Sequence, residues 1–427
     1  MPQEPLTVLI KPAGPDCNLA CRYCFYSGKN EELFSDSPGH RMSDETLREL
    51  IRKYMNYHER IVPFAWQGGE PTLMGLDFFK RAVEYQQLYG RSGQQVSNSL
   101  QTNAVLLDDP AWARFLHEYH FLVGASIDGP PEVHDAFRRD HGGAGSHARV
   151  LAALENLLAH EVEVNVLAMV QPENVHRPAE TYEYLLGLGV DFLQFIPLAE
   201  RNAAGAGLAD FSIAPADYGR FLCEIFDLWA AEQPRQAYVR MFDDALAVVM
   251  GHDHPTCMFG PDCGPYFVVE HNGDIYACDF FVEERWKYGN IHDTRLHHIP
   301  RLELYRTFRA RKTAGLGETA CGRCEWFRMC HGGCPKYRVM LGDAAQPTYF
   351  CEAYRMFFEH ADDTLQAIAQ RLLQSQDARE VAQAVQEPAG GGNADRIAPP
   401  ESSEDRPRRN APCPCGSGRK YKDCCMA

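Results

Sequence analysis

The sixteen cysteines of this 427-residue chain constrain it most, because fifteen of them fall into three groups. Three lie at positions 17–24, eight at 257–351 and four at 413–425. Cys223 stands apart in a stretch with helical apolar spacing and is predicted to be a core thiol. Because the N-terminus shows no secretory pattern, we expect a cytoplasmic protein whose clustered cysteines bind metal rather than form disulfides.

The composition is that of a globular protein with a sizeable core. Apolar residues make up 45% and charged residues 23% of the chain, and 427 residues suffice for two domains and a small third. No apolar run of about 18 residues occurs, so we expect no membrane span. The net charge of −16 argues against a nucleic-acid surface and is attributed to solubility. We expect a monomer.

An alternation of strand-like and helix-like stretches runs from residue 6 to about 235. Six βα units in series predict a parallel sheet with outer helices, curled into a partial (β/α)6 TIM-like barrel of the α/β class. Active sites of such folds lie at the carboxyl ends of the strands. The loops expected there are 17–24, 68–71 and 128–138. The predicted strands are 6–11, 62–66, 96–101, 121–127, 162–170 and 192–198, and the predicted helices are 43–58, 76–89, 109–119, 147–160 and 177–187.

The chain changes character after residue 235. Residues 1–235 are assigned to the barrel, and 236–386 to a cysteine-rich domain that ends in a helix at about 352–386. The segment His271–Asp274 lies between apolar runs and predicts a hairpin turn. Residues 387–409 are rich in Gly, Pro and charge, which indicates a flexible linker, and 410–427 form a compact cysteine module.

The first cysteine group offers three thiolates on one loop, Cys17, Cys21 and Cys24. Three thiolates on a [4Fe–4S] cluster leave one iron open, and cysteines otherwise cap all four irons. An open iron can chelate the amino and carboxyl groups of S-adenosylmethionine and pass an electron to it. The alternative is a zinc site, which would require a fourth ligand.

The segment CNLACRYCF resembles the signature of the radical S-adenosylmethionine superfamily, and GGEP at 68–71 resembles its methionine-binding stretch. By this resemblance Glu70 supports cofactor binding indirectly, through the loop in which it lies. The resemblance implies that S-adenosylmethionine is contacted by Tyr23, Gly68, Gly69, Glu70, Ser126, Arg138, Leu198 and Ala199.

The eight later cysteines resemble the SPASM domain of peptide-modifying radical enzymes. That resemblance implies two auxiliary [4Fe–4S] clusters, three clusters in all, whereas two zinc sites are the alternative. By the same resemblance one auxiliary cluster is held by Cys257, Cys263, Cys278 and Cys334, and the other by Cys321, Cys324, Cys330 and Cys351.

Seven segments, FAWQGGEPTL, SLQTN, SIDGP with HDAFRRD, FLQFI, CDFFV and CEWFRMCHGGCPKYR, resemble anaerobic sulfatase-maturating enzymes over residues 5–370. The resemblance implies oxidation of a cysteine or serine in a Cys/Ser-x-Pro/Ala-x-Arg motif to Cα-formylglycine by a 5′-deoxyadenosyl radical. It makes Asp279 the catalytic base, and the alternative is an aspartate that caps a turn. Tyr26 and Gln67 are expected to face the substrate peptide. The implied partners are an unfolded sulfatase and a flavodoxin or ferredoxin as electron donor.

The C-terminal module resembles the SEC-C motif. Its C-x-C-x8-C-C pattern suits a closed structural zinc site, because a module this small cannot bury a useful core without metal. The implied ligands are Cys413, Cys415, Cys424 and Cys425. A redox-active or disordered tail is the alternative.

Two other functions stay open at this stage. One is a different SPASM enzyme that makes a thioether or epimerised product on a ribosomal peptide. The other is a non-catalytic iron–sulfur or zinc scaffold that recruits partners. The intact CxxxCxxC and GGEP motifs argue against the scaffold, and Asp279 within CDF favours sulfatase maturation.

Overall fold

The computed structural model describes residues 5–35, 39–202, 207–232, 237–339 and 346–374. Strands and helices alternate from the N-terminus as the sequence predicts, with boundaries shifted by one or two residues. The strands of this part are β1 (Thr7–Lys11), β2 (Ile61–Trp66), β3 (Gln95–Thr102), β4 (Phe121–Ser126), β5 (Val164–Val170) and β6 (Phe192–Pro197). The main helices are α2 (Asp44–Tyr57), α3 (Leu76–Tyr89), α4 (Pro110–Glu118), α6 (His147–Ala159) and α7 (Pro178–Leu186).

Short helices stand in the loops that follow three of the strands. Helix α1 (Lys29–Leu33) follows β1, the 3-10 turn η1 (Pro71–Met74) follows β2, and α5 (Pro131–Phe137) follows β4. These are the loops that the sequence places at the carboxyl edge of the sheet.

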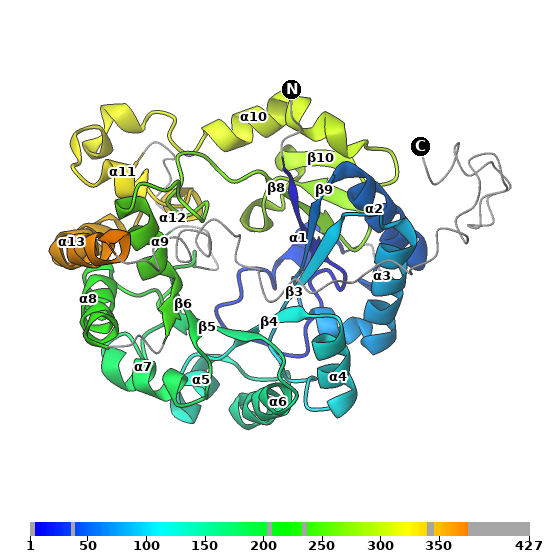
Figure 1. The fold of residues 1–427 in the computed structure, drawn as a ribbon, viewed down its shortest axis with the longest axis horizontal. Coiled ribbons are helices and arrows are strands. Elements are labelled where there is room, and N and C mark those ends of the chain that lie inside the picture. The colour runs from blue at the N-terminus through cyan, green and yellow to red at the C-terminus, as the bar shows by residue number, and fades with distance from the viewer. Residues whose placement is uncertain (1–4, 36–38, 203–206, 233–236, 340–345, 375–427) are drawn as a thin grey trace, which may run out of the picture.

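Ten strands of the described residues form one sheet in the order β10-β9-β8-β1-β2-β3-β4-β5-β6-β7. Strands β1 to β7 (Tyr238–Val239) are parallel neighbours, which confirms the predicted α/β class. Figure 1 shows the strands curving around the inside of a ring of helices, the arrangement of a partial barrel. Side chains along β5 alternate between buried and half-buried, as expected for a strand covered by helices on one face.

The sheet continues into the cysteine-rich region. Strand β8 (Tyr266–Glu270) pairs in parallel with β1, so that Lys11 lies opposite Glu270. Strands β9 (Asp274–Tyr276) and β10 (Lys287–Asn290) add antiparallel pairs, and the predicted hairpin turn joins β8 to β9. The two predicted domains therefore share one sheet across the boundary expected near residue 235.

The remaining helices come after β6 in the chain. Helix α13 (Cys351–Gln374) lies along α8 (Pro215–Ala231) in Figure 1. Cys223 is half-buried between them, and its Sγ lies 3.8 Å from the Met356 carbonyl oxygen. The other elements are α9 (Arg240–Val249), η2 (Asp279–Phe281), η3 (Glu284–Trp286), η4 (Leu296–Arg301), α10 (Glu303–Ala310), η5 (Leu316–Glu318), η6 (Ala320–Arg323), α11 (Phe327–Cys330) and α12 (Lys336–Val339).

Local sequence explains why helix α2 forms where it does. Ser43 precedes it and accepts a hydrogen bond from the Thr46 amide at 3.1 Å, which satisfies one of the free donors at the helix start. Its apolar positions recur every three or four residues and are buried against the sheet. The buried apolar positions are Leu47, Leu50, Ile51, Tyr54 and Met55.

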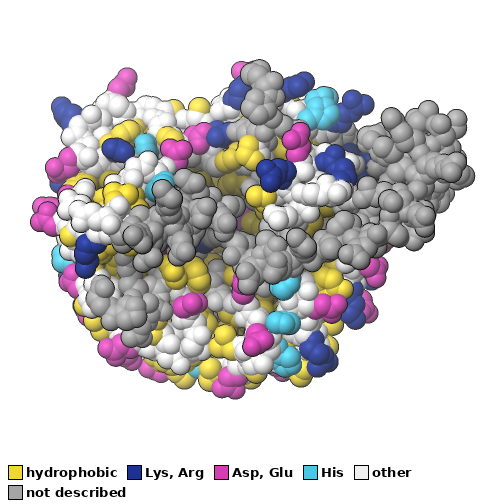
Figure 2. Space-filling model, in the orientation of Figure 1, with side chains coloured by type: hydrophobic (Ala, Val, Ile, Leu, Met, Phe, Trp, Pro, Cys, Tyr) yellow, Lys and Arg dark blue, Asp and Glu magenta, His cyan; other side chains and the backbone are white. Residues whose placement is uncertain are grey.

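The surface is mixed in character. On the face shown in Figure 2, apolar side chains reach the surface toward the middle, whereas acidic and basic side chains mingle along the rim. None of the helices within the described residues is long and apolar enough to cross a membrane. The end of the helix expected to reach residue 386, the linker at 387–409 and the module at 410–427 lie outside the described residues.

Candidate active site

The first cysteine loop follows β1. Cys17 and Cys21 are half-buried, whereas Cys24 is exposed. Burial raises the pKa of the Cys17 thiol to about 12 and that of the Cys21 thiol to about 11, and both thiols lie within electrostatic reach of Cys24. Thiolates are therefore unfavourable here unless a cation balances them, and iron in a cluster supplies such a charge.

Polar groups of the chain contact the thiol of Cys17. In the parts of the chain that the structure describes, no three His, Cys, Asp or Glu side chains converge as a single metal ion requires. The sulfur of Cys17 accepts hydrogen bonds from the Leu19 amide at 3.4 Å and from Asn103 Nδ2 at 3.5 Å. Such contacts to sulfur are among the features that tune iron–sulfur clusters.

The Gly68–Pro71 loop packs directly against the segment that precedes Cys17. The Glu70 amide donates a hydrogen bond to the Asp16 carbonyl oxygen at 2.7 Å. Gly69 has a φ of +50°, and a Cβ at this position would lie 2.1 Å from that same oxygen. Only glycine fits this close approach, so the loop after β2 and the cysteine loop form one unit.

Glu70 holds this unit together from within. Its carboxylate has no exposed surface and accepts hydrogen bonds from the Thr72 amide at 2.9 Å and from Thr102 Oγ1 at 2.7 Å. It also accepts from the Asn103 amide at 2.7 Å, and the Asn103 side chain in turn contacts the sulfur of Cys17. Glu70 thus links the end of β3 to the first cysteine loop.

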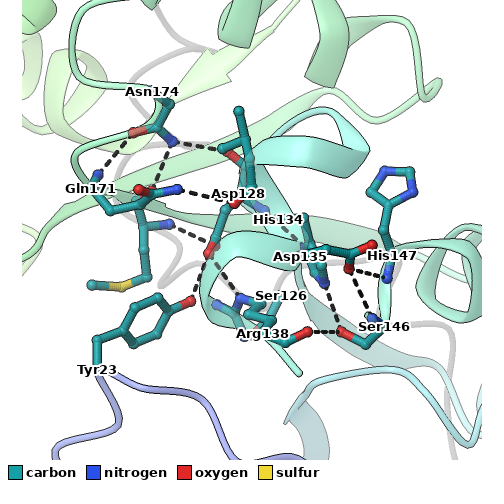
Figure 3. Close-up of polar contacts among 12 residues, drawn as sticks. Tyr23, Ser126, Asp128, His134, Asp135, Arg138, Ser146, His147, Gln171 and Asn174 are labelled. Atoms are coloured by element: carbon teal, nitrogen blue, oxygen red, sulfur yellow. Dashed lines mark hydrogen bonds and ion pairs between the residues drawn. The ribbon is translucent and has the colours of Figure 1, made fainter. Parts of the chain in front are cut away.

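A buried ion pair lies on the opposite side of the same loop. Arg138 Nε donates to Asp128 Oδ2 at 3.0 Å, and the two side chains are 9% and 0% exposed. The Tyr23 hydroxyl donates to the same oxygen at 2.6 Å, as Figure 3 shows. The Tyr23 ring stacks on Phe137 with centroids 5.6 Å apart. Two residues expected to contact S-adenosylmethionine are therefore held by one carboxylate.

Asp128 is itself fixed by its surroundings. Its Oδ1 accepts from the Met169 amide at 3.0 Å, and Asn174 Nδ2 donates to the Asp128 carbonyl oxygen at 2.9 Å (Figure 3). The Asp128 amide donates to His134 Nδ1 at 3.4 Å, which requires that nitrogen to be unprotonated. Burial lowers the pKa of His134 to about 4, in agreement with a neutral ring.

The other residues expected at the cofactor lie at the same end of the barrel. Ser126 ends β4, and its Oγ accepts a hydrogen bond from Gln101 Nε2 at 3.2 Å. Leu198 has no exposed surface and packs with Tyr23 and Phe137, next to partly buried Cys21. Ala199 follows it and is also buried.

Four of the later cysteines gather beside the hairpin of β8 and β9. The thiols of Cys257, Cys263 and Cys278 each lie within electrostatic reach of Cys334. Burial raises the pKa of Cys257 to about 11 and that of Cys263 to about 12. The Tyr266 hydroxyl lies 2.7 Å from the sulfur of Cys278.

The other four cysteines line one pocket with an empty volume of about 320 Å³, counted out to open solvent. The rest of its lining is largely aromatic and includes Trp326 and Phe358. Thr348 Oγ1 and the Tyr354 hydroxyl belong to this lining, are buried, and have no hydrogen-bond partner among the described residues. A pocket with four sulfurs and unsatisfied polar atoms suits a bound group. Its cysteines are Cys321, Cys324, Cys330 and Cys351.

Asp279 lies within electrostatic reach of Tyr26, which follows Cys24 in the first cysteine loop. Asp279 begins η2 directly after Cys278, is 8% exposed, and its Oδ1 lies 3.6 Å from that sulfur. The charge of Asp279 is among the causes that raise the pKa of Tyr26, after burial and the neighbouring Glu270. The Tyr26 hydroxyl donates to Glu270, and the ammonium of Lys11 lies 3.8 Å from the Tyr26 ring centroid.

Comparison with known families agrees with this geometry. Residues 12–185 match the radical SAM superfamily, residues 262–325 an iron–sulfur cluster-binding domain of the SPASM type, and residues 409–427 the SEC-C motif. A serine-type anaerobic sulfatase-maturating enzyme of Bacteroides thetaiotaomicron is 36% identical over 390 residues, which cover 87% of this chain and 93% of that relative. The chain belongs to the anaerobic sulfatase-maturating enzymes. A cysteine-type relative from Clostridium perfringens is 36% identical over 371 residues, 86% of this chain and 99% of that relative.

Solved structures of such maturating enzymes have the same fold. The structure titled "Native anSMEcpe with bound AdoMet" superposes with a TM-score of 0.78 at 35% identity, covering 86% of this chain and all of that one. A second, titled with AdoMet and the Cp18Cys peptide, superposes with a TM-score of 0.77 at 34% identity and covers 86% of this chain and 99% of that one. The predicted partial barrel with a SPASM domain is therefore confirmed.

In this maturating enzyme the two residues expected to contact the substrate peptide lie in the loops that follow two neighbouring strands. Tyr26 lies in the loop after β1, and Gln67 directly follows β2. Gln67 is half-buried, and its amide donates to the Ile10 carbonyl oxygen at 2.9 Å. Both residues therefore belong to the carboxyl edge at which the first cysteine loop lies.

The sequence alone does not single out Asp128, Asn103 or Glu270, although each supports a predicted site residue of this maturating enzyme. A signal was present for two of them. Asn103 directly follows β3 and Asp128 comes two residues after the end of β4, where polar side chains of an α/β fold turn toward the site. Glu270 ends β8, and no sequence pattern reveals that β8 pairs with β1.

Proposed function

We propose that this chain oxidises one cysteine or serine of a sulfatase to Cα-formylglycine. The target residue would begin a Cys/Ser-x-Pro/Ala-x-Arg motif. The observation that carries the proposal is the buried carboxylate of Asp279, which lies 3.6 Å from the Cys278 sulfur and within electrostatic reach of Tyr26. Relatives named as serine-type and cysteine-type enzymes, both 36% identical to this chain, support it.

The residues present fit S-adenosylmethionine and three [4Fe–4S] clusters. Cys17, Cys21 and Cys24 would hold the first cluster and leave one iron open. When bound, these groups supply a carbon radical that removes hydrogen from the target Cβ, and a sink for the electron that leaves. The two auxiliary clusters would be held by Cys257, Cys263, Cys278 and Cys334, and by Cys321, Cys324, Cys330 and Cys351.

Around S-adenosylmethionine the chain would contribute both binding atoms and support. Tyr23, Arg138 and Ser126 would contact the cofactor from one side, and Gly68 and Gly69 from the other. Asp128 would act through Tyr23 and Arg138, which it orders. Glu70, which is fully buried, would act through its loop. Apolar contact would come from Leu198 and Ala199.

Asp279 would accept the thiol or hydroxyl proton of the target residue. A base must be positioned within reach of the proton that it takes, and burial beside Cys278 places this carboxylate away from bulk water. Tyr26 and Gln67 would orient the peptide. A turn-capping role is less well supported, because within the described residues the Asp279 carboxylate accepts from the Cys278 thiol and from no backbone amide.

The partners follow from the same proposal. Structures of a relative carry the Cp18Cys and Kp18Cys peptides in their titles, so an extended sulfatase segment is the substrate proposed here. A flavodoxin or ferredoxin would supply the electron, and the chain would act as a monomer. The SEC-C motif at 409–427 would bind zinc through Cys413, Cys415, Cys424 and Cys425.

A second candidate is modification of a small ribosomal peptide. A mycofactocin maturase from Mycolicibacterium smegmatis is 29% identical over 76% of this chain and 77% of its own length. The lower identity and the shorter coverage place this candidate second.

Anaerobic reconstitution followed by mass spectrometry tests the proposal. We expect about twelve iron and twelve sulfide per chain, 5′-deoxyadenosine on reduction, and Cα-formylglycine in a Cys-x-Pro-x-Arg peptide, its Ser-x-Ala-x-Arg counterpart, or both. A thioether or epimerised product instead would favour the second candidate. Absence of both iron and 5′-deoxyadenosine would leave a scaffold role.

A further inference from the structure

Two cations with no exposed surface, Lys312 and Arg338, lie among the later cysteines. Lys312 Nζ donates to the carbonyl oxygens of Met258, at 2.8 Å, and Cys257. Arg338 donates to the carbonyl oxygens of Gly332 and Gly333, both at 2.9 Å. Within the described residues neither cation pairs with a carboxylate, and the hydrogen-bond partners of both are backbone carbonyl oxygens.

A buried charge without a counter-charge is strongly unfavourable, and carbonyl dipoles offset only part of the cost. The acidic groups that act on Lys312 are the thiols of Cys334, Cys257 and Cys263. Arg338 has thiol neighbours in both groups of four cysteines. These neighbours are Cys321, Cys330, Cys334 and Cys263. We therefore infer that the negative charge that offsets Lys312 and Arg338 comes from the cysteine thiolates and from the clusters that they would bind.

Backbone contacts of the loop between Cys330 and Cys334 fix the position of the Arg338 side chain. The loop from Cys330 to Cys334 joins the pocket of one group to the other group, and all three residues between these cysteines have positive φ. Arg338 binds the carbonyl oxygens of these three residues, His331, Gly332 and Gly333. A Cβ on Gly332 would lie 2.6 Å from Arg338 Nη2, so this loop closes around the guanidinium.

The charged side chains around the first cysteine loop differ from those around the later cysteines. The buried carboxylate of Glu70 acts on the Cys17 thiol. Arg138 acts on Cys21, but it is already paired with Asp128 at 3.0 Å. The surroundings of the first loop therefore offer little net positive charge. Those of the later cysteines offer, within the described residues, two cations without a carboxylate partner against the one buried carboxylate of Asp279 beside Cys278.

We propose that Lys312 and Arg338 are built-in counter-charges that raise the reduction potentials of the auxiliary clusters above that of the first cluster. Adding an electron makes a cluster more negative, so a nearby cation stabilises the reduced form. The inference depends on the proposed function only in that the two groups of four cysteines bind clusters. It assigns a redox-tuning role to two residues that are not among the proposed substrate contacts.

The experiment measures midpoint potentials by EPR in the full-length chain. Replacing the first three ligands (Cys17→Ala, Cys21→Ala and Cys24→Ala) leaves only auxiliary clusters to titrate. Lys312→Gln is introduced into this background, because glutamine keeps donors for the two carbonyl oxygens and removes the charge. We expect the auxiliary midpoints to move to more negative values while iron and sulfide contents stay unchanged.

Lys53→Gln is the matched control. Lys53 also donates to backbone carbonyl oxygens, those of His292 and Thr294, both at 3.1 Å, but it is paired with Glu49 at 3.1 Å. This variant should leave the auxiliary midpoints unchanged. Equal shifts in both variants would overturn the proposal.

Iron content separates failure of this inference from failure of the proposed function. If Lys312→Gln keeps its iron and its midpoints stay in place, the inference is overturned and the enzyme function is untouched. If Lys312→Gln loses iron, Lys312→Arg should retain it, because charge rather than shape is the requirement. Loss of iron from both variants would overturn the inference, and absence of iron from the unaltered protein would overturn the proposed function.

Discussion

Tyr26 donates a hydrogen bond to the fully buried carboxylate of Glu270, and this contact bridges the barrel and the cysteine-rich region. Tyr26 follows the third cysteine of the first loop, whereas Glu270 ends β8, which pairs with β1. The ammonium of Lys11, opposite Glu270 in the sheet, lies 3.8 Å from the Tyr26 ring centroid. The orientation of Tyr26, a proposed substrate-binding residue, therefore depends on a strand more than 240 residues further along the chain.

Glu270→Ala should lower formylglycine formation by about tenfold, because a hydrogen bond to a charged group contributes about 1.5–3 kcal/mol. Glu270→Gln keeps an acceptor for the Tyr26 hydroxyl and should retain more activity. Peptide turnover and 5′-deoxyadenosine formation without peptide are measured side by side, and the latter should stay unchanged. In a Tyr26→Phe background Glu270→Ala should add little. A full additional loss there would mean that Glu270 acts independently of Tyr26.

Asp279→Asn should separate radical formation from product formation. The variant keeps the shape of the side chain but cannot accept the substrate proton, so formylglycine should fall by about 100-fold or more. S-adenosylmethionine cleavage and iron content should stay near those of the unaltered enzyme. Asp274→Asn, at the first residue of β9 five positions before Asp279, is a control that should retain activity. Full product formation by Asp279→Asn would remove Asp279 from the role of base.

His134 should make the fold sensitive to acid. Its folded pKa of about 4 lies below the ordinary value of 6.5, so its contribution is fully present above pH 6.5 and is lost as pH falls through that value toward 4. Between pH 7 and pH 5 this amounts to about 2 kcal/mol, at 1.36 kcal/mol per pKa unit. The thermal midpoint of the unaltered enzyme should therefore fall more over this interval than that of His134→Gln. Parallel falls would mean that other groups set the acid sensitivity.

Much of the barrel follows from sequence because its signals are local. The apolar spacing of α2 and its cap at Ser43 each reflect physical requirements that a short stretch satisfies by itself. Helix α3 begins and ends at the predicted residues, Leu76 and Tyr89. Motifs on short loops were therefore assigned to the correct edge of the sheet.

The supporting contacts could not be predicted, because they join residues that are distant along the chain. Asp128 meets Tyr23 across 105 positions, and Glu270 meets Tyr26 across 244. In the sequence Lys312 and Arg338 cannot be distinguished from surface cations. Their role is inferred from their complete burial among the later cysteines. Pairing between distant strands is set by tertiary packing, for which a single sequence carries no signal.

Removing residues 387–427 should leave the chemistry intact. The barrel and the auxiliary cysteines all lie before residue 375, whereas the SEC-C match covers 409–427. We expect the shortened chain to convert a short sulfatase peptide at an unchanged rate and to lose about one zinc, as four sulfurs suit one tetrahedral site. Elemental analysis and peptide turnover check both points. A fall in peptide turnover with full iron content would assign the module a direct part in catalysis.

Asp128→Asn tests the support of the cofactor residues. The substitution leaves Arg138 buried without its counter-charge, and breaking a buried ion pair costs about 3–5 kcal/mol. It also weakens the hold on Tyr23, so the Kd for S-adenosylmethionine should rise by about tenfold or more. Asp135→Asn is the matched control, because Asp135 lies in the same loop and binds the amides of Ser146 and His147 instead. Calorimetric binding should show a large change for Asp128→Asn alone. Equal weakening in both variants would mean that general loosening of the loop, rather than the Asp128–Arg138 pair, controls cofactor affinity.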